Sequence, residues 1–156
     1  VTIAYATESG NAELVAEELV RALTPHAHAT VVELSNCTPA DLQTDTPMLV
    51  ITSSYDEGEL PTGIRQLHAQ LLADATDLSS LRYALFGLGD RSYEFYCKGA
   101  DILDDTFQTL GGQRIGEIGR HNAGGHTLAV EEATAWVATV REELMAAHRK
   151  EAAVIS

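Results

Sequence analysis

The chain has 156 residues, an apolar fraction of 45 % and a formal net charge of −13, from 23 acidic and 10 basic residues. This length suffices for one domain with a sizeable core, and no apolar run approaches the roughly 18 residues of a membrane-spanning helix. The acidic balance argues against nucleic acids and anionic membranes as partners, because both require a basic surface.

Two further expectations follow from the bulk sequence. The chain opens directly on an apolar run, so we expect no signal peptide. Cys37 and Cys97 lie in unrelated contexts, and in a chain of this size two free thiols are the simpler interpretation. Together these features favour a cytoplasmic protein.

Apolar and amphipathic runs alternate along the chain. Strands are predicted over residues 1–5, 29–34, 47–54, 81–87 and, more weakly, 113–119. Helices are predicted over residues 11–23, 62–73, 98–110 and 129–147, with one helical turn at 39–43. Such alternation predicts an α/β fold, a parallel, doubly wound three-layer sandwich. We expect one domain over residues 1–147 and a frayed C-terminal tail over 148–156.

The segment Thr7-Glu8-Ser9-Gly10-Asn11-Ala12 joins the first predicted strand to the first predicted helix. Short side chains there leave backbone N–H groups available, and the helix adds the positive end of its dipole. No lysine or arginine precedes Arg21. The segment therefore suits a phosphate held by amides, or else it is an ordinary helix cap made by Ser9 or Asn11.

Two more unusual segments follow the third and fourth predicted strands, at residues 53–61 and 87–97. In a parallel sheet these segments open on the same edge as the first one, where ligands of such folds bind. We expect Tyr55 and Tyr93 to approach one flat ring from opposite faces. Loop tyrosines often pack on the protein's own core instead, and this is the simpler interpretation of Tyr96 taken alone. The three segments together predict a planar, phosphorylated ligand.

Three stretches, ATESGNAE, TSSYDEGELP and GLGDRSYEFYC, resemble the three loops that bind flavin mononucleotide (FMN) in flavodoxins. The resemblance is strongest to the flavodoxin-like domains of diflavin reductases, notably the sulfite reductase flavoprotein, and to related small stand-alone flavodoxins. It runs from residue 1 to about residue 140. It implies a flavodoxin-like five-stranded parallel sheet of order 2-1-3-4-5 and non-covalently bound FMN.

The resemblance also implies which residues bind FMN, with the first segment on the phosphate, the second on the ribityl chain and one ring face, and the third on the other wall. Cys97 is then a small residue beside the ring rather than a redox thiol. No catalytic residue and no metal ligand is expected. The cofactor-binding residues are predicted to be Thr7, Glu8, Ser9, Gly10, Asn11, Ala12, Ser53, Ser54, Tyr55, Asp56, Leu88, Gly89, Asp90, Tyr93, Phe95, Tyr96 and Cys97.

Carboxylates crowd the same predicted rim, at Asp56, Glu57, Glu59, Asp90 and Glu94. Their field opposes a further negative charge on the flavin, so we expect the second electron to be held at low potential. The rim also suits basic redox partner proteins, such as a flavin reductase or a haem or iron–sulfur acceptor. The chain departs from the resemblance at Asp56, where many relatives have glycine after the aromatic residue.

The function implied is that of an electron carrier rather than an enzyme on its own. Alternatives are the excised FMN domain of a multidomain diflavin reductase, a flavin-dependent quinone reductase, and a flavin-free interaction module. Other α/β functions lack their motifs, because neither a G-x-x-x-x-G-K-[ST] loop nor a G-x-G-x-x-G turn follows the first strand. His121 and His126 flank a glycine-bearing loop, but their spacing does not define a metal site.

Overall fold

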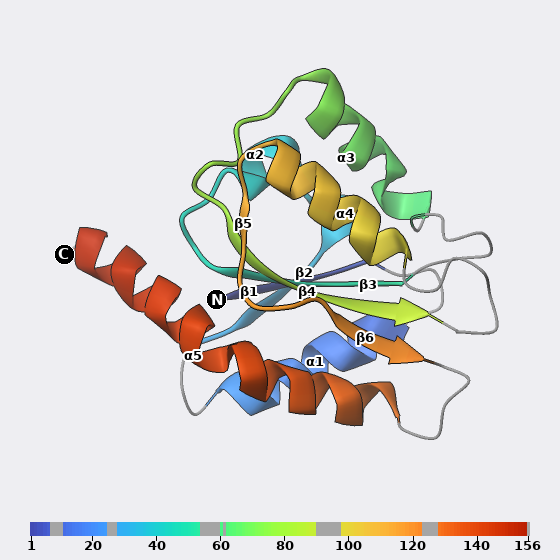
Figure 1. Cartoon of the computed structure of the whole chain (residues 1–156), viewed down its shortest axis with the longest axis vertical. Helices are drawn as coiled ribbons and strands as arrows, with labels where there is room; N and C mark the ends of the chain where they lie inside the picture. Colours follow the sequence, from blue (N-terminus) through green and yellow to red (C-terminus); the bar gives the residue numbers. More distant parts are fainter. Residues whose placement is uncertain are drawn as a thin grey trace.

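The computed structural model describes residues 1–6, 11–24, 28–53, 60, 62–89, 98–122 and 128–155. A parallel sheet runs through the middle of the molecule (Figure 1). Its strand order is β2-β1-β3-β4-β5, and β6 also pairs with β4, so the predicted order is confirmed. The strands are β1 (Thr2–Ala6), β2 (Thr30–Glu33), β3 (Met48–Ser53), β4 (Arg82–Gly89), β5 (Gln113–Arg114) and β6 (Gly119–Asn122).

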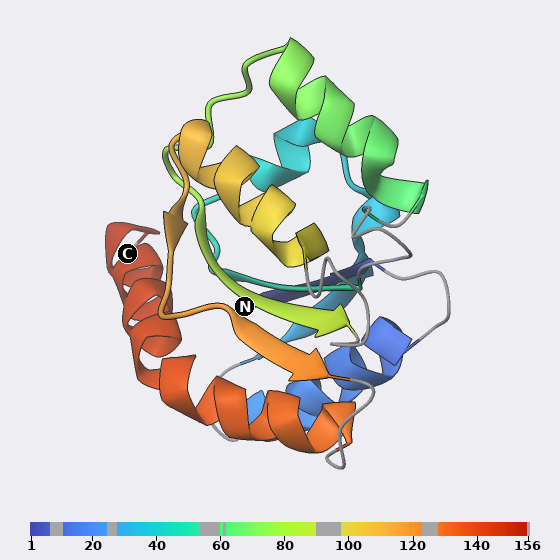
Figure 2. The same ribbon diagram turned by 45° about the vertical axis from the view of Figure 1, so that its right-hand side comes forward.

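Helices cover both faces of this sheet, and Figure 2 shows the three layers from a second direction. The described helices are α1 (Asn11–Leu23), α2 (Pro39–Leu42), α3 (Thr62–Ala73), α4 (Lys98–Thr109) and α5 (Ala129–Ile155), with a 3-10 turn η1 (Leu34–Asn36). Side chains of α1 and α5 share one core with Ile3 and Ile51, whereas those of α3 and α4 share the other with Ala4 and Val50. Adjacent strand residues thus alternate between two buried faces, which explains why the central strands are apolar throughout.

Several predicted elements differ from the observed ones at their ends. Helices α1 and α3 have the predicted bounds. The turn predicted at residues 39–43 is α2, which begins with a capping box between Thr38 and Asp41. The η1 turn was not predicted. Helix α5 continues to Ile155 instead of ending at 147, because residues 148–155 contain neither glycine nor proline and are rich in helix-forming types.

The prediction of one fifth strand over residues 113–119 is wrong in detail, because the strand is interrupted and ends later. Tyr83 of β4 pairs with Arg114, but Phe86 pairs with Gly119. Between these two pairs β4 has two residues, 84 and 85, whereas the neighbouring segment has four, 115–118, so two extra residues interrupt the fifth strand. Gly116 takes a positive φ of 68° within this excursion, where a β carbon would lie 2.6 Å from Val140. Beyond it β6 carries the strand to the carboxyl edge of the sheet.

Candidate functional site

The carboxyl ends of four strands meet at one edge of the sheet. Ala6, the last residue of β1, pairs with Thr52 of β3, Ser53 pairs with Leu88 of β4, and Gly89 pairs with Asn122 of β6. The arrowheads of β3, β4 and β6 accordingly point the same way in Figure 1. The strands that end with Ala6, Ser53, Gly89 and Asn122 all end at this edge, as the sequence predicted for the first three. In parallel sheets this is the edge that binds ligands.

Helix α1 begins at this edge and presents its positive end there. The first backbone N–H groups of a helix have no acceptor within it, so they are free to bind an anion. Ala12 is fully buried against the core that also contains Ile3 and Leu88. The start of the helix is therefore packed in the core on the face of the sheet that α1 and α5 cover. The only charged residue of its first turn is acidic, Glu13, so amides rather than cationic side chains would hold an anion here.

The described residues include only part of the predicted cofactor site. Ala12 and Leu88 are described in full, and both lie in the core on the α1 and α5 face. The backbones of Asn11, Ser53 and Gly89 lie at the edge. The other predicted contacts lie outside the described residues and stay predictions: Thr7, Glu8, Ser9, Gly10, Ser54, Tyr55, Asp56, Asp90, Tyr93, Phe95, Tyr96 and Cys97.

Two side chains of β6 contact α4 and α5, which lie on opposite faces of the sheet. Arg120 Nη2 lies 2.6 Å from Asp101 Oδ1 in α4, and Nη1 lies 3.4 Å from Oδ2. The buried His121 places Nδ1 3.2 Å from Glu132 Oε1 in α5. Sequence reasoning missed Arg120, Asp101 and Glu132, and considered His121 only as a metal ligand. The missed signal was the extension of the strand to Asn122, which alone brings these residues to the edge.

A third contact adjoins the second site segment. Arg65, in α3, donates from Nε to the carbonyl of Leu60 at 3.0 Å. Leu60 is buried and lies immediately beyond residues 54–59. A cation on the helix thus fixes the backbone at the point where this segment ends.

Acidic groups gather around the end of the molecule where α1 and α5 begin. The first turn of α5 contains Glu131 and Glu132. The pKa of Tyr5, near the end of β1, is raised above its ordinary value, first by burial and then by the negative charges of Glu13, Glu33 and Glu17. Two leucines are strongly exposed near the same helix starts, Leu14 at 61 % and Leu128 at 63 %. This end therefore combines negative charge with exposed apolar side chains.

Metal chemistry has little support in the described part of the chain. There, no group of three or more His, Cys, Asp or Glu side chains is placed to hold a metal ion. His121 instead faces Glu132 between β6 and α5. His126 lies outside the described residues.

Comparison with known proteins points in the same direction as this geometry. The chain is 37 % identical over 117 residues to the flavoprotein alpha-component of NADPH sulfite reductase from Thiocapsa roseopersicina, covering 74 % of the chain and 22 % of the relative. It is 31 % identical over 147 residues to the mitochondrial NADP(+) pyruvate dehydrogenase of Euglena gracilis, covering 92 % of the chain and 8 % of that protein. The chain thus spans less than a quarter of the length of either relative.

Among solved structures, a short-chain flavodoxin associated with a non-canonical PDU bacterial microcompartment superposes with a TM-score of 0.76 at 26 % identity. The match covers 92 % of this chain and 97 % of that one. The family model described as flavodoxin matches residues 3–139. The chain therefore belongs to the flavodoxin family, with FMN as its cofactor and electron transfer as its function.

Proposed function

We propose that this chain carries electrons, on FMN bound at the carboxyl edge of its sheet, between a reductase and a redox acceptor. The observation that carries the proposal is that β1, β3 and β4 end where α1 begins. The chain also matches the flavodoxin family over residues 3–139. The unpaired amides of a helix start fit a phosphate. FMN supplies reversible redox chemistry, and the chain's own residues bind it, shield it and tune its potential.

Each predicted segment has its own role in this proposal. The amides and hydroxyl of the Ser9–Asn11 stretch hold the phosphate dianion, helped by the α1 dipole. Tyr55 and Tyr93 cover the two ring faces and exclude water from them. Carboxylates in segments 54–59 and 90–97 oppose added negative charge on the ring.

Within this proposal, we favour a stand-alone electron carrier that has no substrate of its own. It is supported by the match to a stand-alone short-chain flavodoxin over 97 % of that chain. The second choice is that these residues form the FMN domain of a larger reductase. It is supported by relatives whose names denote NADPH- or NADP-linked enzymes, of which this chain spans 22 % or less. We further propose a cytoplasmic location; among the described helices none is long and apolar enough to cross a membrane.

The partner is proposed to be a basic redox protein, such as a flavin reductase or a haem or iron–sulfur acceptor. Support comes from the net charge of −13 and from the carboxylates at the starts of α1 and α5. The exposed Leu14 and Leu128 lie near the same helix starts and add apolar contact area. Opposite charges steer such encounters, while apolar contact stabilises the docked pair.

The proposal is tested by the visible spectrum of the purified protein. The protein should be yellow, or become so on adding FMN, and stepwise dithionite should bleach it reversibly. With NADPH and a quinone but no reductase, turnover should be absent, and adding a flavin reductase should restore electron flow. A colourless protein that ignores FMN would overturn the proposal. Quinone turnover by the protein alone would replace the carrier with an enzyme.

A further inference from the structure

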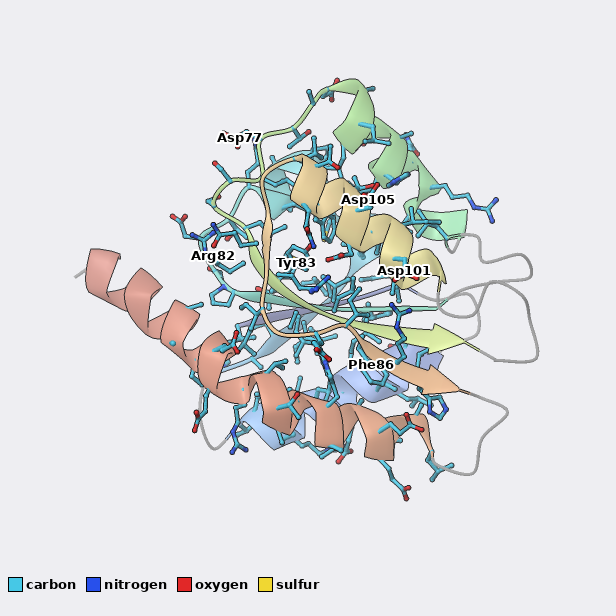
Figure 3. The ribbon with its side chains drawn as sticks, in the orientation of Figure 1. Asp77, Arg82, Tyr83, Phe86, Asp101 and Asp105 are labelled. Carbon is cyan, nitrogen blue, oxygen red and sulfur yellow. The ribbon has the colours of Figure 1, made fainter. Side chains whose placement is uncertain are left out.

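Two consecutive residues of β6 each contact one of the two helices that flank this part of the sheet. Arg120 contacts Asp101 on the α4 face, and His121 contacts Glu132 on the α5 face. Successive side chains of a strand point to opposite faces, so a single strand end reaches both helices. Asp101 and Glu132 are each the fourth residue of their helix. Figure 3 labels Asp101 at the end of α4 that is nearer to the arrowheads of the strands.

We propose that Arg120 and His121 are positioning residues for FMN, acting through Asp101 and Glu132. Helix α4 starts where the segment 90–97 ends, and α5 starts where 123–127 ends. By fixing the first turns of both helices to the end of β6, the two contacts determine where both segments rejoin the fold. This inference rests on the proposed function, because it assumes that FMN is bound at this edge.

The geometry of the Arg120 contact favours such a role. Each terminal nitrogen of the guanidinium donates to one carboxylate oxygen of Asp101, Nη2 to Oδ1 at 2.6 Å and Nη1 to Oδ2 at 3.4 Å, and a contact through two atoms constrains orientation as well as distance. The side chains are 35 % and 49 % exposed, and exposed pairs contribute little to global stability. The contact is therefore better suited to aligning a helix start than to holding the fold together.

The His121 contact differs in being largely buried, and the 3.2 Å approach of Nδ1 to Glu132 Oε1 does not have the geometry of a hydrogen bond. The side chain of His121 is 8 % exposed and that of Glu132 is 34 % exposed. The backbone of His121 pairs with Leu88, whose side chain lies in the core with Ala12 at the start of α1. The contact thus joins the end of β6 to α5 on the face of the sheet that α1 also covers.

A control contact of the same kind exists on the same helix, α4, but joins it to β5 rather than to β6. Arg114 of β5 contacts Asp104 of α4 at 2.7 Å, with 30 % and 14 % of the side chains exposed. Asp104 lies one helical turn beyond Asp101, and Arg114 pairs with Tyr83 rather than with the end of β4. The two arginine–aspartate pairs differ in their distance from the cofactor edge, and Asp104 also accepts hydrogen bonds from Tyr83 and Gln108.

The test is FMN titration of the apoprotein of the wild type and of R120Q, D101N and the double variant. FMN is an anion, so a pure charge effect would make R120Q weaken binding and D101N strengthen it. Positioning instead makes both single variants weaken it, and we expect Kd to rise roughly fivefold or more in each. The double variant should be no worse than either single one, because both remove the same contact. H121Q and E132Q should show the same pattern.

Further measurements separate positioning from loss of fold. R114Q should change Kd less than about twofold, and the visible circular dichroism of bound FMN should change in R120Q but not in R114Q. Urea unfolding of each apoprotein shows whether a variant is folded. Tighter binding in D101N, or equal effects of R120Q and R114Q, would overturn the inference. If the wild type binds no FMN, the proposed function itself fails, which is a distinguishable result.

Discussion

The hydroxyl of Tyr83 donates a 2.6 Å hydrogen bond to Oδ1 of Asp104, while Oδ2 accepts from Nη1 of Arg114 at 2.7 Å. One carboxylate thus joins β4, α4 and β5, and Gln108 adds a contact from the next turn of α4. Tyr83 is fully buried, and burial, followed by Asp104, raises its pKa far above the ordinary value. Figure 3 shows Tyr83 on the α4 side of the sheet and Phe86 on the α5 side.

Replacing Tyr83 by phenylalanine should lower stability without affecting cofactor binding. The variant removes one donor from Asp104, which keeps Arg114 and Gln108, so we expect a loss of roughly 1 to 2 kcal/mol in the free energy of unfolding. Urea unfolding of the apoprotein measures this loss. FMN affinity should stay within about twofold of the wild type, because sites without shared partners are nearly independent. A large loss of FMN affinity with unchanged stability would contradict this division.

His68 should make the stability depend on pH. Its Nε2 lies 2.8 Å from Thr106 Oγ1, joining α3 to α4, and burial lowers its pKa below the ordinary 6.5. Between the lowered pKa and 6.5 the unfolded chain binds a proton that the folded chain does not, so stability rises with pH. Stability should therefore fall as the pH decreases from about 7, and stop falling from this cause below the folded pKa.

The variant H68Q isolates this effect, because glutamine retains a group that can bond Thr106 but does not titrate. Unfolding free energies of the wild type and H68Q should be compared between about pH 5 and pH 8. The difference between the two curves should favour the wild type increasingly as the pH rises through 6.5. A difference that is constant with pH, or that has the opposite slope, would rule out this role for His68.

Gly119 should not tolerate a side chain. A β carbon there would lie 2.5 Å from Phe86 Cδ2 and 2.6 Å from Trp136 Cδ1. The indole Nε1 of Trp136 donates to the Glu117 carbonyl at 3.1 Å, so the ring is held in place over the start of β6. We expect G119A to lose roughly 1 to 3 kcal/mol, as overpacked cores do. Trp136 is the only tryptophan, so its emission reports the unfolding directly.

The double variant G119A/W136L is the check on this explanation. Leucine relieves the contact with the indole but not the one with Phe86, so the double variant should lose somewhat less than the sum of the two single losses. Its unfolding is followed by far-UV circular dichroism, because this variant has no tryptophan. Strictly additive losses would mean that the strain at Gly119 does not come from the indole ring.

The elements that could be predicted from sequence are those whose signal is local. In α1 the buried Val15, Ala16 and Leu19 repeat with helical spacing. The fifth strand could not be predicted in detail, because its interruption depends on how Glu117 and Gly119 meet Trp136 of a distant helix. The predicted order of the strands in the sheet was implied by the resemblance to flavodoxins, and periodicity alone does not predict it.

The candidate site likewise has one feature that the sequence predicted and another that it did not. Its location followed from parallel topology, since the segments after β1, β3 and β4 must leave one edge. The contacts of Arg120 and His121 could not be foreseen, because each depends on strand register and on residues distant in sequence. Arginine and histidine at adjacent positions have no periodic signal of their own.

Docking of a basic partner should depend on Glu13 and Glu17, the carboxylates of the first two turns of α1. We expect E13Q/E17Q to slow electron transfer to a basic haem protein such as cytochrome c, with a weaker dependence on ionic strength than in the wild type. The matched control is E142Q/E143Q, an equal change in charge on exposed residues of α5. These residues lie about 20 Å along the helix from its start.

Stopped-flow oxidation of the reduced protein at low and high salt measures both effects. The control variant should behave like the wild type, because its charges are screened from the docking end by more than a Debye length of about 10 Å. If both double variants slowed transfer equally, net charge rather than a localised surface would govern the encounter. If neither did, the carboxylates at the start of α1 would have no part in it, and the approach of the partner would depend on the acidic segments 54–59 and 90–97 instead.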